Sequence, residues 1–205
     1  MYSYQTPSLA VCLSLSRVLS VGNELPSDIE LMARLGRGDL AALGILAERY
    51  QNRVLSLAYR LLGDWHRAED VSQETFLRLR QAAGQYEPKA KFTTWLYRIV
   101  HNLSLDQQRK ATNDPVSLEA LQADAEETAQ ESPVERRELA QAVQNAIRAL
   151  PERQRRVVIL HRYEGLSHEE IGEVTGWSKS AVESLLVRAY ENLRKKLAFY
   201  QDFSQ

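Results

Sequence analysis

Apolar residues recur every three or four positions along most of this 205-residue chain, which is the spacing of a helix with one buried face. The longest stripe runs through Leu43, Leu46, Tyr50, Val54, Leu57 and Leu61. Further stripes predict helices over residues 65–83, 93–110, 134–149 and 151–165, and a short helix begins at Ser27. Asp39 and Asp64 can cap helix starts, and Gly63 can end a helix. No segment alternates as a strand does, so the pattern predicts an all-α chain.

Residues 165–194 carry the pattern of a helix-turn-helix. Ser167 and Glu170 form a capping box at the start of the first helix. Gly176 lies at the turn, and Ser178 can cap the second helix. The polar outer side of that second helix and its cap comprise Ser178, Lys179, Ser180, Glu183, Ser184, Val187 and Arg188. Such a face suits the major groove of DNA, although a pair of ordinary packed surface helices would share part of this pattern.

The distribution of charge divides the chain into three parts. The formal net charge of −1 conceals an excess of cations in residues 26–112 and 136–196, and seven acids without a single base in residues 113–135. We therefore predict two small helical domains, over residues 26–112 and 135–200, joined by a flexible acidic linker over residues 113–134. The second domain contains the helix-turn-helix. The linker is either a solvated tether or a segment that occupies a channel built for a polyanion.

The composition excludes several classes of protein. One cysteine, Cys12, cannot form an internal disulfide and fits a reducing compartment. The apolar stretch over residues 9–21 is too short to cross a bilayer and lacks the positive segment of a signal peptide. We therefore expect residues 1–25 to be a disordered extension and the protein to be cytoplasmic, without membrane insertion. The four histidines have no metal-ligand spacing and no glycine-rich phosphate loop is present, so we expect no cofactor, no metal and no enzymatic activity.

Three segments in order carry a family resemblance. They are residues 64–78 (DWHRAEDVSQETFLR), residues 92–102 (FTTWLYRIVHN), and residues 150–155 (LPERQR), which run into the helix-turn-helix. In this order and spacing, the chain resembles the extracytoplasmic-function (ECF) sigma factors of bacterial RNA polymerase over about residues 26–198. The resemblance implies a transcription initiation factor that binds core RNA polymerase and promoter DNA and is held by an anti-sigma factor. It also implies that the acidic linker runs toward the RNA exit path, where its negative charge imitates RNA.

One face of the helix over residues 65–83 is a candidate for polymerase binding. Asp70, Gln73, Glu74 and Leu77 lie at i, i+3, i+4 and i+7 and so share an outward face. An isolated helix with this face would simply be solvated. The resemblance instead implies that the face docks on the clamp helices of the largest polymerase subunit, with Leu77 as a small apolar anchor inside a polar rim.

The helix over residues 93–110 is a candidate reader of the minus-ten promoter element. Asn102, Asp106 and Arg109 lie opposite its apolar stripe, and the resemblance implies that this face meets the melted non-template strand. The preceding loop can form a pocket for an unstacked base, with Tyr86 as the stacking surface. The predicted minus-ten contacts are Tyr86, Lys89, Lys91, Arg98, Asn102, Asp106, Arg109 and Lys110. Phe92 and Trp95 fit the inward register better and are expected in the core.

The outer face of the second helix-turn-helix helix is then expected to read the minus-thirty-five element as duplex. This chain departs from many members of the family, which have Gly-Thr-Val-basic-Ser-basic where it has SAVESL over residues 180–185. Glu183 costs affinity among phosphates unless it accepts a hydrogen bond from a cytosine amino group or pairs with Lys179. The promoter sequence of relatives therefore does not carry over to this chain.

Two other classes of protein share parts of the pattern. A sigma-mimicking protein that titrates an inhibitor would keep the fold, but it would usually carry a fused receiver domain, for which this sequence shows no candidate. A plain helix-turn-helix repressor or activator would have no need of the polymerase-docking face in the first domain. Transcription from a defined promoter by core polymerase and the purified chain separates these alternatives.

Overall fold

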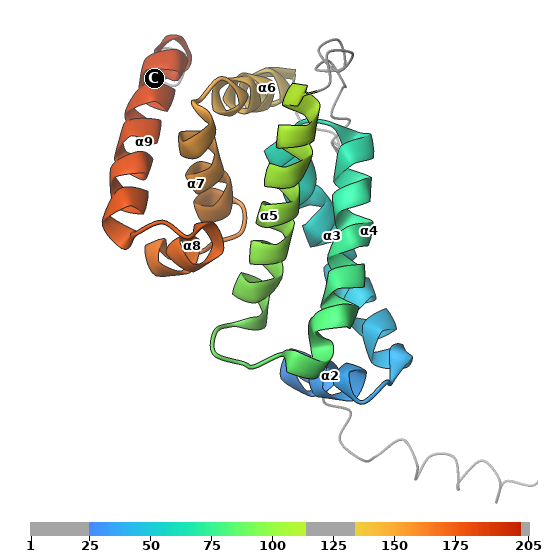
Figure 1. Cartoon of the computed structure of the whole chain (residues 1–205). Helices are drawn as coiled ribbons and strands as arrows, with labels where there is room; N and C mark the ends of the chain where they lie inside the picture. The colour runs from blue at the N-terminus through green and yellow to red at the C-terminus, as the bar shows by residue number, and fades with distance from the viewer. Residues whose placement is uncertain (1–24, 114–133, 202–205) are drawn as a thin grey trace, which may run out of the picture.

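The computed structural model describes residues 25–113 and 134–201, and within these ranges all regular structure is helical (Figure 1). The first domain contains α2 (Asp28–Gly36), α3 (Leu40–Leu62), α4 (Trp65–Ala82), the 3-10 turn η1 (Ala83–Gln85) and α5 (Phe92–Asn113). The second domain contains α6 (Val134–Arg148), α7 (Glu152–Arg162), α8 (His168–Thr175) and α9 (Lys179–Gln201). The predicted all-α, two-domain fold class is confirmed. The predicted N-terminal extension and most of the predicted linker lie outside the described residues.

The core of the first domain forms where α3, α4 and α5 pack side by side (Figure 1). Five of the six residues of the predicted α3 stripe are buried, and Leu43 is half-buried. The predicted inner face of α4 is also buried. Phe92 lies in the core as expected, whereas Trp95 is half-buried and packs at its edge in an aromatic cluster with Tyr86 and Phe92. The apolar periodicity therefore located the helix faces that hold this domain together.

The helix ends follow from side-chain caps. The side chains of Ser27, Asp39 and Asp64 accept hydrogen bonds from the backbone N–H groups at the starts of α2, α3 and α4. Gly63 has a φ of 73° and ends α3 in the left-handed conformation that glycine tolerates best. The caps predicted at Asp39, Asp64 and Gly63 are confirmed, and Ser27 forms one of the two bonds of the capping box that its spacing to Glu30 predicts.

Several predicted helix bounds differ from the structure. The sequence predicts that the first short helix ends before Gly36 and Gly38, but α2 includes Gly36, and the left-handed residue beyond it is Gly38, with a φ of 95°. α5 continues to Asn113, because the first residue that disfavours helix is the one before Pro115. Pro151 is the N-cap of α7 rather than part of its first turn, since its ψ of 141° is extended.

The two domains contact each other through α5 against α8 and α3 against α7. The α5 side of this contact is polar: Tyr97, His101 and Ser104 are buried at helical spacing along it. From α7, the guanidinium of Arg156 hydrogen-bonds the side chain of Gln108 on α5 and the carboxylate of Glu152, and only 2% of Arg156 is exposed. His101 Nε2 and Arg156 Nη1 are buried without a hydrogen-bond partner. Unpaired polar atoms make this contact weaker than an apolar core of the same size.

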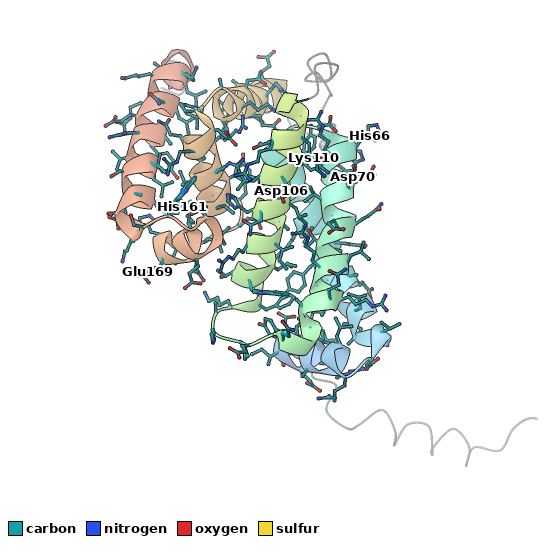
Figure 2. The ribbon with its side chains drawn as sticks, in the orientation of Figure 1. His66, Asp70, Asp106, Lys110, His161 and Glu169 are labelled. Atoms are coloured by element: carbon teal, nitrogen blue, oxygen red, sulfur yellow. The ribbon has the colours of Figure 1, made fainter. Side chains whose placement is uncertain are left out.

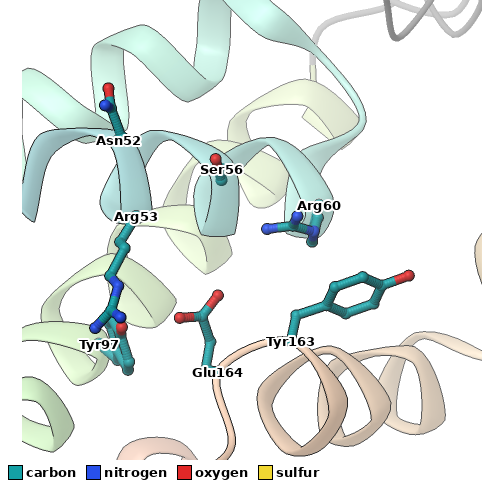
Figure 3. Close-up of a pocket in the computed structure, with 7 residues that line it drawn as sticks. All are labelled: Asn52, Arg53, Ser56, Arg60, Tyr97, Tyr163 and Glu164. Carbon is teal, nitrogen blue, oxygen red and sulfur yellow. The ribbon is translucent and has the colours of Figure 1, made fainter. Parts of the chain in front are cut away.

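The loop between α7 and α8 reaches α3 beside this contact. Figure 3 shows Glu164 pointing from that loop toward α3, where a hollow of about 310 Å³ is lined by Arg53, Arg60 and Tyr97, among others. The guanidinium of Arg60 lies 4.4 Å from the ring centre of Tyr163 in the same loop. Burial raises the pKa of Glu164, and a hydrogen bond from Tyr97 opposes that shift. The second contact between the domains is thus also built from charged and polar groups.

Acidification is expected to weaken the contact between the domains through His101. Burial, and then the nearby Arg156, lower the pKa of His101 to about 4, while a hydrogen bond with Asn102 and the charge of Glu152 oppose the shift. The contact between the domains therefore favours the neutral form of His101. When the domains are separate, His101 has its ordinary pKa of 6.5 and takes up a proton at a higher pH than it does in the contact. Between about pH 7 and about pH 5 the cost to the contact is roughly 2 kcal/mol. Small-angle scattering should show the radius of gyration rising over that range.

His101→Gln is the matched control, because glutamine stays neutral at every pH in this range. Glu164 acts in the opposite direction, since a raised carboxyl pKa favours contact at lower pH. The difference between wild type and His101→Gln therefore isolates the histidine. If both proteins expand equally on acidification, His101 is not the group responsible.

Candidate nucleic-acid interface

The helix-turn-helix is held by caps at both helix starts. Ser167 Oγ accepts a hydrogen bond from the Glu170 backbone N–H at 3.2 Å, and Glu170 Oε2 accepts one from the Ser167 backbone N–H at 2.8 Å. The predicted capping box is therefore present. Gly176 ends α8 with a φ of 76°, and Ser178 Oγ accepts from the Ala181 backbone N–H at 3.2 Å. These local bonds fix where α9 begins and which of its faces is exposed.

The exposed face of α9 matches the prediction. Val182, Leu186 and Ala189 are buried against the other helices of the domain. The side chains left exposed include every predicted minus-thirty-five residue: Ser178, Lys179, Ser180, Glu183, Ser184, Val187 and Arg188. Val187 is 59% exposed, which is unusual for an aliphatic residue on a folded helix and suits contact with a thymine methyl group.

The two charged residues near the start of α9 pair with α8 rather than with each other. Lys179 Nζ lies 2.7 Å from Glu169 Oε1, which raises the pKa of Lys179 and lowers that of Glu169. Glu183 Oε1 lies 3.5 Å from His168 Nδ1. The pairing of Glu183 with Lys179, one of the two roles left open by the sequence, is therefore replaced by a contact with His168.

On α5, the predicted minus-ten residues Arg98, Asn102, Asp106, Arg109 and Lys110 are all exposed. They share the solvent side of the helix, where Figure 2 labels Asp106 and Lys110. Asp106 Oδ1 lies 3.8 Å from Arg109 Nη1, and Asn102 Oδ1 lies 3.4 Å from His101 Nδ1. Both of these contacts are weak enough in geometry to be exchanged for contacts with a base.

The loop before α5 differs from the expected open pocket. Tyr86 was predicted as a stacking surface, but its ring is half-buried and packs 5.0 Å from Trp95 and 6.2 Å from Phe92, centre to centre. Burial raises the pKa of its hydroxyl. Lys89 is exposed beside Glu87, and Lys91 Nζ lies 2.8 Å from Glu170 Oε1 in the second domain. Tyr86 packs inward because the short loop leads directly into the aromatic cluster.

The Lys91 contact links this loop to the helix-turn-helix. The pKa of Lys91 is raised by its hydrogen bond with Glu170, and the pKa of Glu170 is lowered to about 2, first by Lys91 and then by the Ser167 backbone. One of the predicted minus-ten cations is therefore neutralised by an acid of the other domain in this arrangement.

The candidate polymerase face on α4 lies away from the second domain (Figures 1 and 2). Asp70, Gln73 and Leu77 are exposed, and Glu74 is half-buried with its carboxylate 3.0 Å from Arg78 Nε. Leu77 is 52% exposed, so an apolar side chain stands among polar ones as expected. The structure brings these four residues together on one surface.

Sequence reasoning did not identify the residues that join the domains. His101 and Arg156 are each 2% exposed, although both are polar and neither belongs to an apolar stripe. The signal for His101 in the sequence is the polar spacing Tyr97, His101, Ser104 and Gln108 along α5, which repeats at three and four residues. Such spacing on a long helix indicates a second packed face.

Comparison with known families matches both domains. The Sigma-70 region 2 family model matches residues 46–113, and the Sigma-70 region 4 family model matches residues 140–193. A helical region 2 followed by a helix-turn-helix region 4 defines the sigma-70 class of transcription initiation factors, which direct RNA polymerase to promoters and are not enzymes.

Curated relatives narrow the class. The chain is 34% identical over 171 residues to the ECF RNA polymerase sigma factor SigW of Bacillus subtilis, an alignment that covers 78% of this chain and 91% of the relative. It is 32% identical over 180 residues to the RNA polymerase sigma-H factor of Pseudomonas aeruginosa, covering 83% of this chain and 93% of that protein. The chain belongs to the ECF RNA polymerase sigma factors.

Solved structures agree on the fold. CnrH, solved in complex with the cytosolic domain of CnrY, is 28% identical with a TM-score of 0.59, and the match covers 87% of this chain and 99% of CnrH. The sigma factor RpoE of Bartonella quintana, solved with the anti-sigma factor NepR, is 20% identical with a TM-score of 0.64, covering 76% of this chain and 96% of that one. Within residues 25–113 and 134–201, the structure has no helix long and apolar enough to span a membrane.

Proposed function

We propose that this ECF sigma factor reads the minus-thirty-five element as duplex with α9 and the melted minus-ten element with α5 and the loop before it. The observation that carries the proposal is the exposed polar face of α9, oriented by two capped helix starts and flanked by α8. On α5, an amide, a carboxylate and three cations share one exposed side, which is the set of groups that can contact bases and phosphates.

We propose further that α4 binds core RNA polymerase through Asp70, Gln73, Glu74 and Leu77. This face remains exposed when the domains are in contact, so polymerase can engage the first domain before the second domain moves. We propose two domains over residues 26–112 and 135–200, with residues 113–134 connecting them. The family matches over residues 46–113 and 140–193 support this division.

Reading both elements at once requires the domains to separate. The two elements are about 25 positions apart, or roughly 85 Å at 3.4 Å per base pair. In the structure α8 packs directly on α5, and Lys91 contacts Glu170. The arrangement with the domains in contact therefore corresponds to a factor that is not on its promoter.

We infer that an anti-sigma factor binds this protein and that the protein acts in the cytoplasm. The ECF family membership supports both, and CnrH, which has a similar structure, was solved in complex with the cytosolic domain of another protein, CnrY. A protein partner that favours the contact between the domains would prevent the factor from binding polymerase and promoter at the same time. The acidic linker would act either as a tether or as an imitation of RNA in the exit path.

The double variant Gln73→Lys/Leu77→Asp should lose binding to core polymerase. Both side chains are exposed, so the fold should survive, while an unpaired charge buried in an interface costs several kcal/mol. Co-purification with core enzyme is the measurement, and circular dichroism checks the fold. Gln51→Lys, an exposed glutamine on α3, is the matched control. Unchanged co-purification of the double variant would rule out this face.

Asn102→Ala and Asp106→Ala should each weaken promoter opening at particular minus-ten bases. Each lost base contact reduces discrimination by about 1–3 kcal/mol. Transcription from templates varied at every minus-ten position measures the preference. Lys110→Ala is the control, because loss of a phosphate contact should lower activity on all templates alike. If both variants keep the wild-type preference at every position, this side of α5 does not read sequence.

Glu183→Gln should change which minus-thirty-five sequence is preferred more than it changes total affinity. Glutamine keeps the size of the side chain but adds a donor and loses the charge that faces His168. Arg188→Ala should instead weaken binding to all sequences and reduce the salt slope by about one unit if Arg188 contacts a phosphate. Binding to a randomised minus-thirty-five duplex at two salt concentrations distinguishes the two. Uniformly tighter binding of Glu183→Gln with the same preference would mean that Glu183 only repels DNA.

A further inference from the structure

A hollow beside α9 is lined by residues of α9 and by one residue of α7. It measures about 190 Å³ and is lined by Arg153, Ala181, Ser184, Leu185 and Arg188. Ser184 and Arg188 belong to the exposed face of α9, and Ala181 and Leu185 are half-buried beneath them. Arg153 comes from the first turn of α7 and is exposed. The hollow therefore joins α7 to the edge of the surface that would face DNA.

The guanidinium of Arg153 is held in place by an aromatic ring. Its central carbon lies 4.6 Å from the ring centre of Trp177, which is half-buried in the turn between α8 and α9. A guanidinium that stacks on a ring keeps its N–H donors free at its edge, and less side-chain entropy is lost when those donors bind. Arg153 is thus oriented before any ligand arrives.

The hollow is lined by cations, and no acid of the described residues lines it. Its lining contains two arginines and no acid, and neither Arg153 nor Arg188 forms an ion pair with a described carboxylate. Two cations on the candidate DNA surfaces are by contrast paired with acids, Lys179 with Glu169 and Lys91 with Glu170. An unpaired pair of guanidiniums with a nearby serine hydroxyl fits an oxyanion such as a phosphodiester.

The two edges of α9 differ in charge. On one edge Glu183 contacts His168 of α8, and on the other Ser184 and Arg188 adjoin Arg153 of α7. A helix in the major groove is bordered by the phosphate backbone, while bases are read from its centre. We propose that Arg153 and Arg188 together bind one backbone phosphate of the minus-thirty-five duplex, so that α7 as well as α9 contacts DNA. This proposal rests on the proposed role of α9.

The test measures binding of the full chain, in complex with core polymerase, to a pool of duplexes randomised across the minus-thirty-five element. Arg153→Gln should reduce the slope of log affinity against log salt by about one unit, so that its deficit relative to wild type shrinks roughly threefold between about 50 and about 200 mM salt. The preferred sequence should not change, because a phosphate contact carries no base information. Arg153→Lys should keep the slope, since the charge is retained.

Arg162→Gln is the matched control. Arg162 is exposed on the same helix, nine residues further along and so on its opposite side. Equal salt slopes for Arg153→Gln, Arg162→Gln and wild type would overturn the phosphate site while leaving the role of α9 intact. A changed base preference in Arg153→Gln would also overturn it, in favour of direct reading by Arg153. Loss of salt-dependent binding in the wild type itself would overturn the role of α9 and this proposal with it.

Discussion

The contact between the two domains depends on a buried cation that one domain cannot satisfy alone. Arg156 of α7 is almost fully buried, and its guanidinium takes a partner from each side, Glu152 on its own helix and Gln108 on α5. Separating the domains returns these groups to water, which hydrates them well. A contact of this kind is specific in geometry yet small in net free energy, and this is the balance that a reversible arrangement requires.

Charged groups are also paired within the chain on the surfaces that would contact nucleic acid. Several of their cations are paired with acids of this chain, as in Lys179 with Glu169 and Lys91 with Glu170. On the proposed DNA surfaces, these internal ion pairs and the small positive excess of each domain would both limit the affinity of the free factor for DNA. In the proposed function, binding to polymerase would supply the binding energy that the factor alone lacks.

Much of the fold was predictable because its signals are local. Caps such as Ser167 and Asp64 and turn residues such as Gly176 act within a few positions of themselves, and apolar stripes report the face that each helix buries. The exposed faces of α4, α5 and α9 could then be predicted as the sides opposite those apolar stripes. Arg156 and His101 could not be found in this way, because their burial depends on a partner far away in the sequence. The inward packing of Tyr86 was not predicted for a similar reason, since it depends on the aromatic residues of α5.

The two oxygens of Glu170 serve different parts of the molecule. Oε2 completes the cap of α8 by accepting from the Ser167 backbone, and Oε1 meets Lys91 of the other domain. Because the tasks fall on separate atoms, losing the lysine leaves the helix start intact. If the domains separate as proposed, the contact between Lys91 and Glu170 would break while the cap of α8 stays formed. The helix-turn-helix would then move as a preformed unit, without refolding.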